Sequence, residues 1–227
     1  MNLQSALEQS CDTYFYKIGQ ETGIEALGET CRKFGLGTKT GIDIPNEKGG
    51  NIPTKAWKKK SYDQVWTHGD TVNASIGQGY VLTTPLQLAS MTVALVNGGI
   101  LHRPRLLQEE QATRLGIEPD YLNIIKLGME SVMNGSRGTA RGSRIAEPDY
   151  LMGGKTGTAQ VRKITVRGQN QDELPWRMRH HALFVGYAPI ENPRYVCAVV
   201  IEHGGGGSKA AAPVARDLLL KTKELIG

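Results

Sequence analysis

The stretch GGKTGTAQV, Gly153 to Val161, places a lysine between a glycine pair and two threonines. A phosphate-binding P-loop reads GxxxxGK[ST], and Gly154, Lys155 and Thr156 match its last three positions. Its first glycine is missing, because Asp149 stands there. A P-loop lysine also opens a helix, whereas the residues that follow here are rich in Thr and Val and favour a strand. The sequence therefore favours a lysine carried on a strand.

Histidines and cysteines raise the question of metal binding and disulfides. His180 and His181 are adjacent, and adjacent residues on a strand point to opposite faces, so the pair does not easily share an ion. The three cysteines, Cys11, Cys31 and Cys197, are odd in number and far apart. They imply no disulfide framework and do not determine the redox compartment.

The elements that must position these residues begin with helices. Leu3 and Leu7 recur at helical spacing, and the sequence SCD at Ser10–Asp12 precedes a second helical run that Gly23 stops. We expect a helix, a tight turn and a second helix, followed by a third helical run. Residues 36–70 are predicted to be mostly loop.

The clearest helix signal lies in TTPLQLASMTVALVNGG. Thr84 can cap it, Pro85 occupies the first helical position, Gln87 completes a capping box, and Gly98–Gly99 end it. A further helix is predicted from about Pro119 to Met133. The Gly- and Arg-rich connector NGSRGTARGS leads from that helix towards Lys155.

After Lys155 the pattern changes to short β-branched and aromatic runs. We predict strands near Lys155–Val166, Ala182–Ala188 and Tyr195–Glu202, the last two joined by the hairpin-like turn IENP. A final amphipathic helix is predicted from about Pro213. Helices, then antiparallel strands, then one helix indicate an α+β fold. We find no linker that would divide it, so residues 1–227 are predicted to form one domain.

Composition narrows the functional classes. The chain has 227 residues, of which 39% are apolar, enough for a sizeable core. Lys and Arg number 27 against 22 Asp and Glu, a modest excess in clusters that we interpret as solvated faces. These clusters lack interleaved aromatic residues, so we do not expect nucleic-acid binding. No apolar run approaches the ~18 residues of a membrane span, and the amino terminus lacks the order of a signal peptide.

Four blocks together resemble a known family. The segments SCDTYFYKIG, SIGQGYVLTTPLQLA, GGKTGTAQV and HHALFVGYAP are similar, in order and rough spacing, to the transpeptidase domain of class B penicillin-binding proteins, above all the penicillin-binding protein 2 group that acts in cell-wall elongation. The likeness covers nearly the whole chain. It implies the α+β fold shared with serine β-lactamases, without its first part, and with the three predicted strands antiparallel in sequence order. Two further strands would normally complete the sheet, so the third strand should form an unprotected edge.

The resemblance also implies a reaction. Members of this family cross-link peptidoglycan stem peptides through a serine acyl-enzyme, and β-lactams acylate the same serine. Ser10 matches the serine of the second family box and would relay a proton. Asp12 takes the position that Asn usually holds in that box. Lys155 would polarise Ser10 and help to bind the substrate carboxylate, which requires hydrogen-bond reach between the two side chains.

The KTG box itself supplies binding groups in this reading. Thr156 and Thr158 would offer hydroxyl groups to the substrate carboxylate, and the backbone N–H of Thr158 would form half of the oxyanion hole. Gly157 leaves the strand bare, so that substrate can lie alongside it. An isolated KTG tripeptide would more often be an ordinary surface strand, and the other three blocks are what favour this interpretation.

Cys11 is the one residue with a possible metal role. Some members of this subfamily place a zinc-binding cysteine inside the second box, with the other ligands upstream. Such partners are not in this sequence, and a small buried thiol is the alternative that we favour. No cofactor is expected to be required, and a structural zinc ion would belong to the full-length protein.

The family nucleophile, the serine of an SxxK box, is missing. No serine of this sequence is followed three positions later by lysine, and only nine residues precede Ser10. We therefore expect the nucleophile upstream of Met1, and this chain to be the carboxyl-terminal part of a longer protein. Two alternatives stay open, a nonenzymatic remnant that begins at Met1 and a relative of the serine β-lactamases.

The resemblance also implies partners and a location. The expected ligands are stem peptides that end in D-Ala-D-Ala, together with β-lactams. The expected partners of the full-length protein are membrane proteins of the elongation complex. The expected location is the periplasmic side of the bacterial inner membrane, with an anchor encoded upstream.

Overall fold

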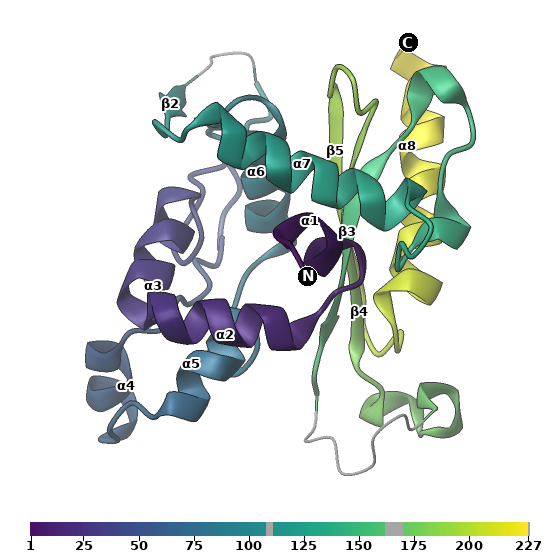
Figure 1. Cartoon of the computed structure of the whole chain (residues 1–227). Coiled ribbons are helices and arrows are strands. Elements are labelled where there is room, and N and C mark those ends of the chain that lie inside the picture. The colour runs from purple at the N-terminus through teal and green to yellow at the C-terminus, as the bar shows by residue number, and fades with distance from the viewer. Residues whose placement is uncertain (108–110, 162–169, 227) are drawn as a thin grey trace. The chain divides into compact units, whose positions relative to one another are not determined.

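The structure is a computed structural model that describes residues 1–107, 111–161 and 170–226 (Figure 1). By its internal contacts the chain separates into two compact units. The first comprises Met1 and Cys11–Leu122, and the second comprises Asn2–Ser10 and the chain from Asn123 onward. The sequence predicts one undivided domain, and folding of the two units as a single domain stays a prediction.

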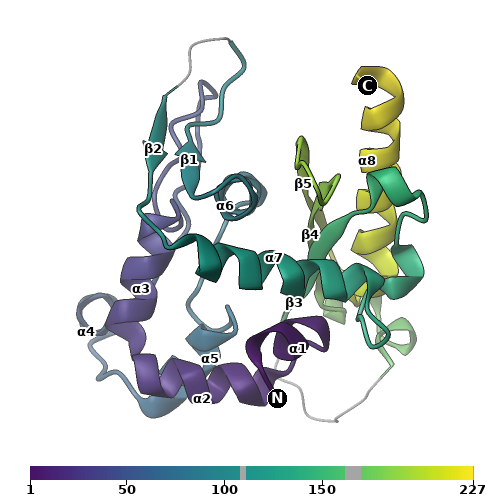
Figure 2. The ribbon, with the colours of Figure 1, turned by 45° about the horizontal axis from the view of Figure 1, so that its top comes forward.

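The first unit is mainly helical. Its elements are α2 (Asp12–Thr22), α3 (Ile24–Lys33), α4 (Lys55–Tyr62), α5 (His68–Ser75), α6 (Pro85–Val96), β1 (Ile100–His102) and β2 (Ala112–Arg114). Helices α2 and α5 pack closely, because Gly19 brings its backbone against Ser75, where a Cβ atom would lie 2.2 Å from the Ser75 Cβ. The antiparallel pair β1–β2 lies beside α6, as Figure 2 shows.

The predicted helix signals in this unit are largely confirmed. At α6, Thr84 and Gln87 form the reciprocal capping box and Pro85 is the first helical residue. The prediction of loop over residues 36–70 is wrong in part, because α4 and the start of α5 lie there. Helix α4 has few apolar residues to reveal its period, and it is capped instead by Thr54, whose side chain accepts a hydrogen bond from the Trp57 N–H.

The second unit combines helices with a sheet. It contains α1 (Leu3–Glu8), the greater part of α7 (Pro119–Asn134), β3 (Gly153–Ala159), β4 (His181–Ala188), β5 (Tyr195–Ile201) and α8 (Ala212–Ile226). Short turns are the 3₁₀ helices η1 (Arg141–Ser143), η2 (Pro148–Tyr150), η3 (Gln171–Glu173) and η4 (Trp176–Met178), and the π-helical turn η5 (Gly207–Ala211). The expected α+β fold is therefore observed.

The sheet has the predicted order and direction. Within the described residues it reads β3–β4–β5, antiparallel throughout, with Lys155 opposite Val185 and Gly157 opposite Leu183. Strand β5 forms one edge among these residues, as expected. Strand β3 begins two residues before the predicted Lys155 and ends at Ala159, and the rest of its predicted length from residue 162 lies outside the described residues.

Helix α8 covers one face of β4 and β5 (Figure 1). The core between them and the end of α7 consists of large buried side chains with little solvent exposure: Val132, Met133, Ile145, Tyr150, Met152, Phe184, Val199 and Leu219. The Tyr150 hydroxyl donates to the Leu219 carbonyl across this core. In the part of the chain that is described, no helix is both long and apolar enough to cross a bilayer.

Candidate active site

Ser10 stands at the junction between two helices in a left-handed backbone conformation. Its φ is +51°, which is uncommon for a residue with a Cβ atom and costs roughly 1–2 kcal/mol. Its N–H donates to the Leu7 carbonyl at 3.2 Å, which closes the end of α1. Such strain is often found where a side chain must be aimed for function.

Helix α1 is fixed to the rest of the second unit by contacts on both of its sides. Leu7 packs against Gly128 of α7, where a Cβ atom would approach the Leu7 Cδ1 to 2.4 Å. The Glu8 carboxylate accepts a hydrogen bond from the Arg137 N–H at 3.0 Å, and the Glu8 carbonyl accepts one from the Thr139 N–H at 3.2 Å. The position of Ser10 is thus tied to α7 and to the connector that follows it.

Lys155 meets Ser10 from strand β3. Its Nζ donates to the Ser10 Oγ at 2.5 Å, across 145 positions of sequence. The same amine lies 3.0 Å from the Thr156 carbonyl oxygen and 3.4 Å from the Thr156 Oγ1. The predicted hydrogen-bond reach between Ser10 and Lys155 is observed. Because β3 continues as a strand after Lys155, the P-loop alternative is excluded.

Thr156, Gly157 and Thr158 follow Lys155 on the same strand. Successive side chains of a strand alternate between its faces, so the two threonines share one face and Gly157 lies on the other. Thr139 Oγ1 lies 3.3 Å from Thr156 Oγ1. Neither Thr139 nor Glu8 is among the site residues that the sequence predicts. A glycine-rich connector just before the box was the available signal, but composition alone does not say which of its side chains faces the strand.

Cys11 and Asp12 belong to the first unit, whereas Ser10 and the KTG residues belong to the second. Cys11 occupies the N-cap position of α2 and Asp12 is the first helical residue. The Thr13 hydroxyl, 3.3 Å from the Cys11 sulfur, and the Tyr14 backbone lower the pKa of the Cys11 thiol. Burial has the opposite effect on Cys197, whose pKa it raises to about 11. Cys11 is therefore the more reactive thiol of the two.

The histidine pair behaves as two separate side chains. His180 Nδ1 accepts from the Val161 N–H at 3.1 Å, and His181 Nδ1 accepts from the His203 N–H at 2.9 Å. Among the described residues, no group of three His, Cys, Asp or Glu side chains is arranged to hold a metal ion. Each histidine thus binds the backbone of another segment, at Val161 and at His203 respectively.

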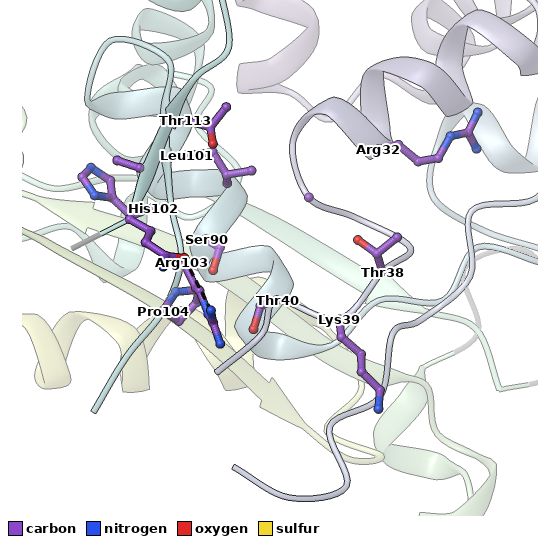
Figure 3. A pocket seen from close by; sticks show the side chains of 13 residues that line it. Arg32, Thr38, Lys39, Thr40, Ser90, Leu101, His102, Arg103, Pro104 and Thr113 are labelled. Atoms are coloured by element: carbon purple, nitrogen blue, oxygen red, sulfur yellow. Dashed lines mark hydrogen bonds between the residues drawn. The ribbon is translucent and has the colours of Figure 1, made fainter. Parts of the chain in front are cut away.

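A cavity of about 330 Å³ lies in the first unit beside β1 and carries three cationic side chains (Figure 3). Arg103 is engaged by the protein: its Nε donates to the Gly41 carbonyl at 2.6 Å, and its NH2 group lies 3.7 Å from Asp43. The Arg32 side chain points away from Arg103, as Figure 3 shows. The cationic side chains therefore do not converge on one point. Arg103 links the loop at Gly41 and Asp43 to the end of β1.

Comparison with known proteins gives a consistent result. Residues 1–220 match the model of the penicillin binding protein transpeptidase domain. The chain is 39% identical over 232 residues to the peptidoglycan D,D-transpeptidase MrdA of Haemophilus influenzae, a match that covers 96% of this chain and 36% of that protein.

Two solved structures extend this result to the fold. The penicillin-binding protein PBP2 of Helicobacter pylori, solved in complex with MreC, superposes with a TM-score of 0.89 at 35% identity and covers 100% of this chain and 41% of that one. PBP2 of Pseudomonas aeruginosa, solved in complex with WCK 5153, gives a TM-score of 0.81 at 36% identity and covers 100% of this chain and 50% of that one. The chain spans about a third of the length of the curated relatives that it matches.

Proposed function

Because the chain belongs to the penicillin-binding protein transpeptidase family, in its PBP2 (MrdA) group, we propose that it is the carboxyl-terminal part of a peptidoglycan D,D-transpeptidase of cell-wall elongation. The observation that carries the proposal is the contact between Lys155 and Ser10. An ammonium group 2.5 Å from a serine hydroxyl, on a strand with hydroxyl-bearing neighbours, is equipped to move a proton and to attract a carboxylate.

The proposed reaction proceeds by acyl transfer. A serine hydroxyl attacks the carbonyl carbon of the penultimate D-Ala, an ester forms, the peptide bond breaks, and the terminal D-Ala leaves as an amine that has gained a proton. The amine of a second stem peptide then attacks the ester and releases the serine. We assign the nucleophile to an SxxK box encoded upstream of Met1.

The residues of this chain supply proton transfer and binding in that reaction. Ser10 relays the proton to the leaving amine, and Lys155 polarises Ser10 and attracts the terminal carboxylate. Thr156 and Thr158 donate their hydroxyls to that carboxylate, and the Thr158 N–H forms half of the oxyanion hole. Gly157 keeps the strand open to the peptide. Stem peptides that end in D-Ala-D-Ala are the proposed substrates, and β-lactams the proposed inhibitors.

Two residues of the first unit complete the proposal. Asp12 follows Ser10 by two positions at the start of α2 and takes the place of the second box's third residue. Cys11 would contribute to a structural zinc ion only with ligands encoded upstream.

We also propose that the full protein is anchored on the periplasmic side of the inner membrane, with partners among membrane proteins of the elongation complex. The MreC complex of the Helicobacter pylori relative supports that class of partner.

The test compares two proteins, this chain alone and the same chain extended by its upstream coding sequence. Both are incubated with a fluorescent penicillin, and mass spectrometry locates the adduct. We expect covalent labelling of the extended protein at an SxxK serine and none of the short chain, because the groups described here stabilise an attack but do not perform it. A serine-to-alanine variant of the SxxK serine is the matched control.

Four results would contradict the proposal. Stoichiometric labelling of the short chain would place the nucleophile within it. An upstream region without an SxxK box, or an extended protein that is not labelled, would favour a nonenzymatic remnant. Rapid hydrolysis of the penicillin adduct would favour a β-lactamase over a transpeptidase.

A further inference from the structure

The connector between α7 and β3 brings a second hydroxyl to the KTG strand. Thr139 comes from this connector and Thr156 from β3, and their Oγ1 atoms are 3.3 Å apart. Both residues are half-buried. The connector therefore contributes a side chain directly beside the proposed carboxylate site.

Thr139 is held in place by its backbone. Its N–H donates to the Glu8 carbonyl at 3.2 Å, and the next residue, Ala140, donates to the Val132 carbonyl at 3.1 Å. One residue earlier, Gly138 passes so close to α7 that a Cβ atom would lie 2.4 Å from the Val132 carbonyl oxygen. Anchors on both sides leave little freedom at residue 139, which favours a preorganised side chain.

The spacing of the polar groups suits a shared ligand oxygen. Hydroxyl–hydroxyl hydrogen bonds are usually about 2.7–2.8 Å long, and the 3.3 Å between Thr139 and Thr156 is longer. The Lys155 Nζ is 3.4 Å from the same Thr156 Oγ1. The Thr156 hydroxyl thus has both a second hydroxyl and an ammonium group within 3.4 Å. A carboxylate, which accepts through two oxygens and about four lone-pair sites, can engage all three donors.

We propose that Thr139 is a further substrate-binding residue, which donates its hydroxyl to the terminal carboxylate of the acyl-donor peptide together with Thr156. The inference rests on the proposed transpeptidase function and adds to it a residue that lies outside the KTG box. Because a hydrogen bond to a charged group is stronger than one between neutral groups, loss of the hydroxyl should weaken recognition of the carboxylate by about tenfold or more.

The experiment uses the upstream-extended protein and two forms of one penicillin, the free acid and its methyl ester, whose carboxylate is blocked. Second-order acylation constants are measured for both forms. For Thr139→Val we expect the constant for the free acid to fall about tenfold and that for the ester to change little, so that the preference for the acid shrinks. Thr139→Ser keeps the hydroxyl and should restore the preference. Ser136→Ala, an exposed residue of the same connector, is the control.

Equal slowing of acid and ester by Thr139→Val would overturn the inference, because it would mean that Thr139 only supports the strand. An unchanged acid constant would overturn it as well. If the wild-type protein is not acylated at all, the proposed function fails separately. The inference is then tested by titrating the protein with acetyl-D-Ala-D-Ala and following the amide signals of Thr156 and Thr158 by NMR. Weaker binding in Thr139→Val than in Ser136→Ala supports it, and equal binding overturns it.

Discussion

Two lysines, one in each unit, show how different surroundings divide structural from chemical roles. Lys58 in the helical unit is 4% exposed and forms an ion pair with Asp70 at 2.6 Å. Lys155 in the sheet unit directs its amine at the Ser10 hydroxyl, at 2.5 Å. The first lysine meets a carboxylate that is itself anchored, since the Asp70 Oδ2 also accepts from the Thr67 N–H and hydroxyl, both at 2.7 Å.

The difference lies in what each partner does with the positive charge. A buried ion pair neutralises both charges, and its loss leaves one charge unpaired, so it serves the fold. A hydroxyl group is neutral and exchanges protons, so an ammonium beside it can take part in proton transfer. The role of Lys58 should therefore be tested by measuring the stability of the fold, and the role of Lys155 by measuring the rate of acylation.

Lys155→Ala should have the largest effect. In the upstream-extended protein we expect penicillin acylation to slow by about a thousandfold, which corresponds to roughly 4 kcal/mol of transition-state stabilisation, because Ser10 and the carboxylate both lose the amine. The melting temperature should stay close to that of the wild type. Stopped-flow labelling and a thermal melt measure the two quantities, and a large loss of stability without loss of rate would reverse the assignment.

Lys58→Met should do the opposite. Removing the amine leaves the Asp70 carboxylate, only 14% exposed, without its cation, and we expect the free energy of unfolding to fall by about 3 kcal/mol. Acylation per folded molecule should be unchanged. Urea unfolding checks the first expectation. Lys59→Met, which removes a lysine from an ion pair that is 62% and 90% exposed, is the control and should cost less than about 1 kcal/mol.

Gly207→Ala tests how the strand that carries Lys155 is held. A Cβ atom at Gly207 would lie 2.5 Å from the Gly157 carbonyl oxygen and 2.3 Å from that of Leu183. We expect a loss of about 1–3 kcal/mol in stability and slower acylation, because the strand must move. Gly206→Ala is the matched control, since nothing lies within 4 Å of its Cβ position. If both variants behave alike, the close contact does not position β3.

The smallest expected effect concerns pH. Burial by itself would raise the pKa of Asp70, but hydrogen bonds from Lys58 and Thr67 outweigh it and hold the pKa below its ordinary value. A carboxyl with a lowered pKa in the folded state stabilises above its unfolded pKa of about 3.9, and this contribution disappears as the pH falls through the folded pKa. The stability gap between wild type and Asp70→Asn should therefore be largest near neutral pH and close below about pH 4.

Some of these features could be read from the sequence because they depend on neighbouring residues. The capping box of Thr84 and Gln87, the order of the strands and the turn at Ser10 follow from local patterns or from motifs of the family. Helix α4 was missed because its lysine-rich sequence shows little apolar periodicity. No linker in the sequence marks the boundary between the two units within α7, between Leu122 and Asn123, because the helical pattern continues across it.

Sequence patterns alone indicate a lysine on a strand, a serine between two helices, and most of the helices and strands that carry them. Which side chains meet depends on the tertiary fold. Lys155 reaches Ser10 because Leu7 packs on Gly128 and the Glu8 carbonyl binds the Thr139 N–H, contacts between segments far apart in the chain. Those contacts depend on close packing and backbone hydrogen bonds, which local propensity does not encode. For the same reason Thr139 joined the site only when the fold placed it beside Thr156.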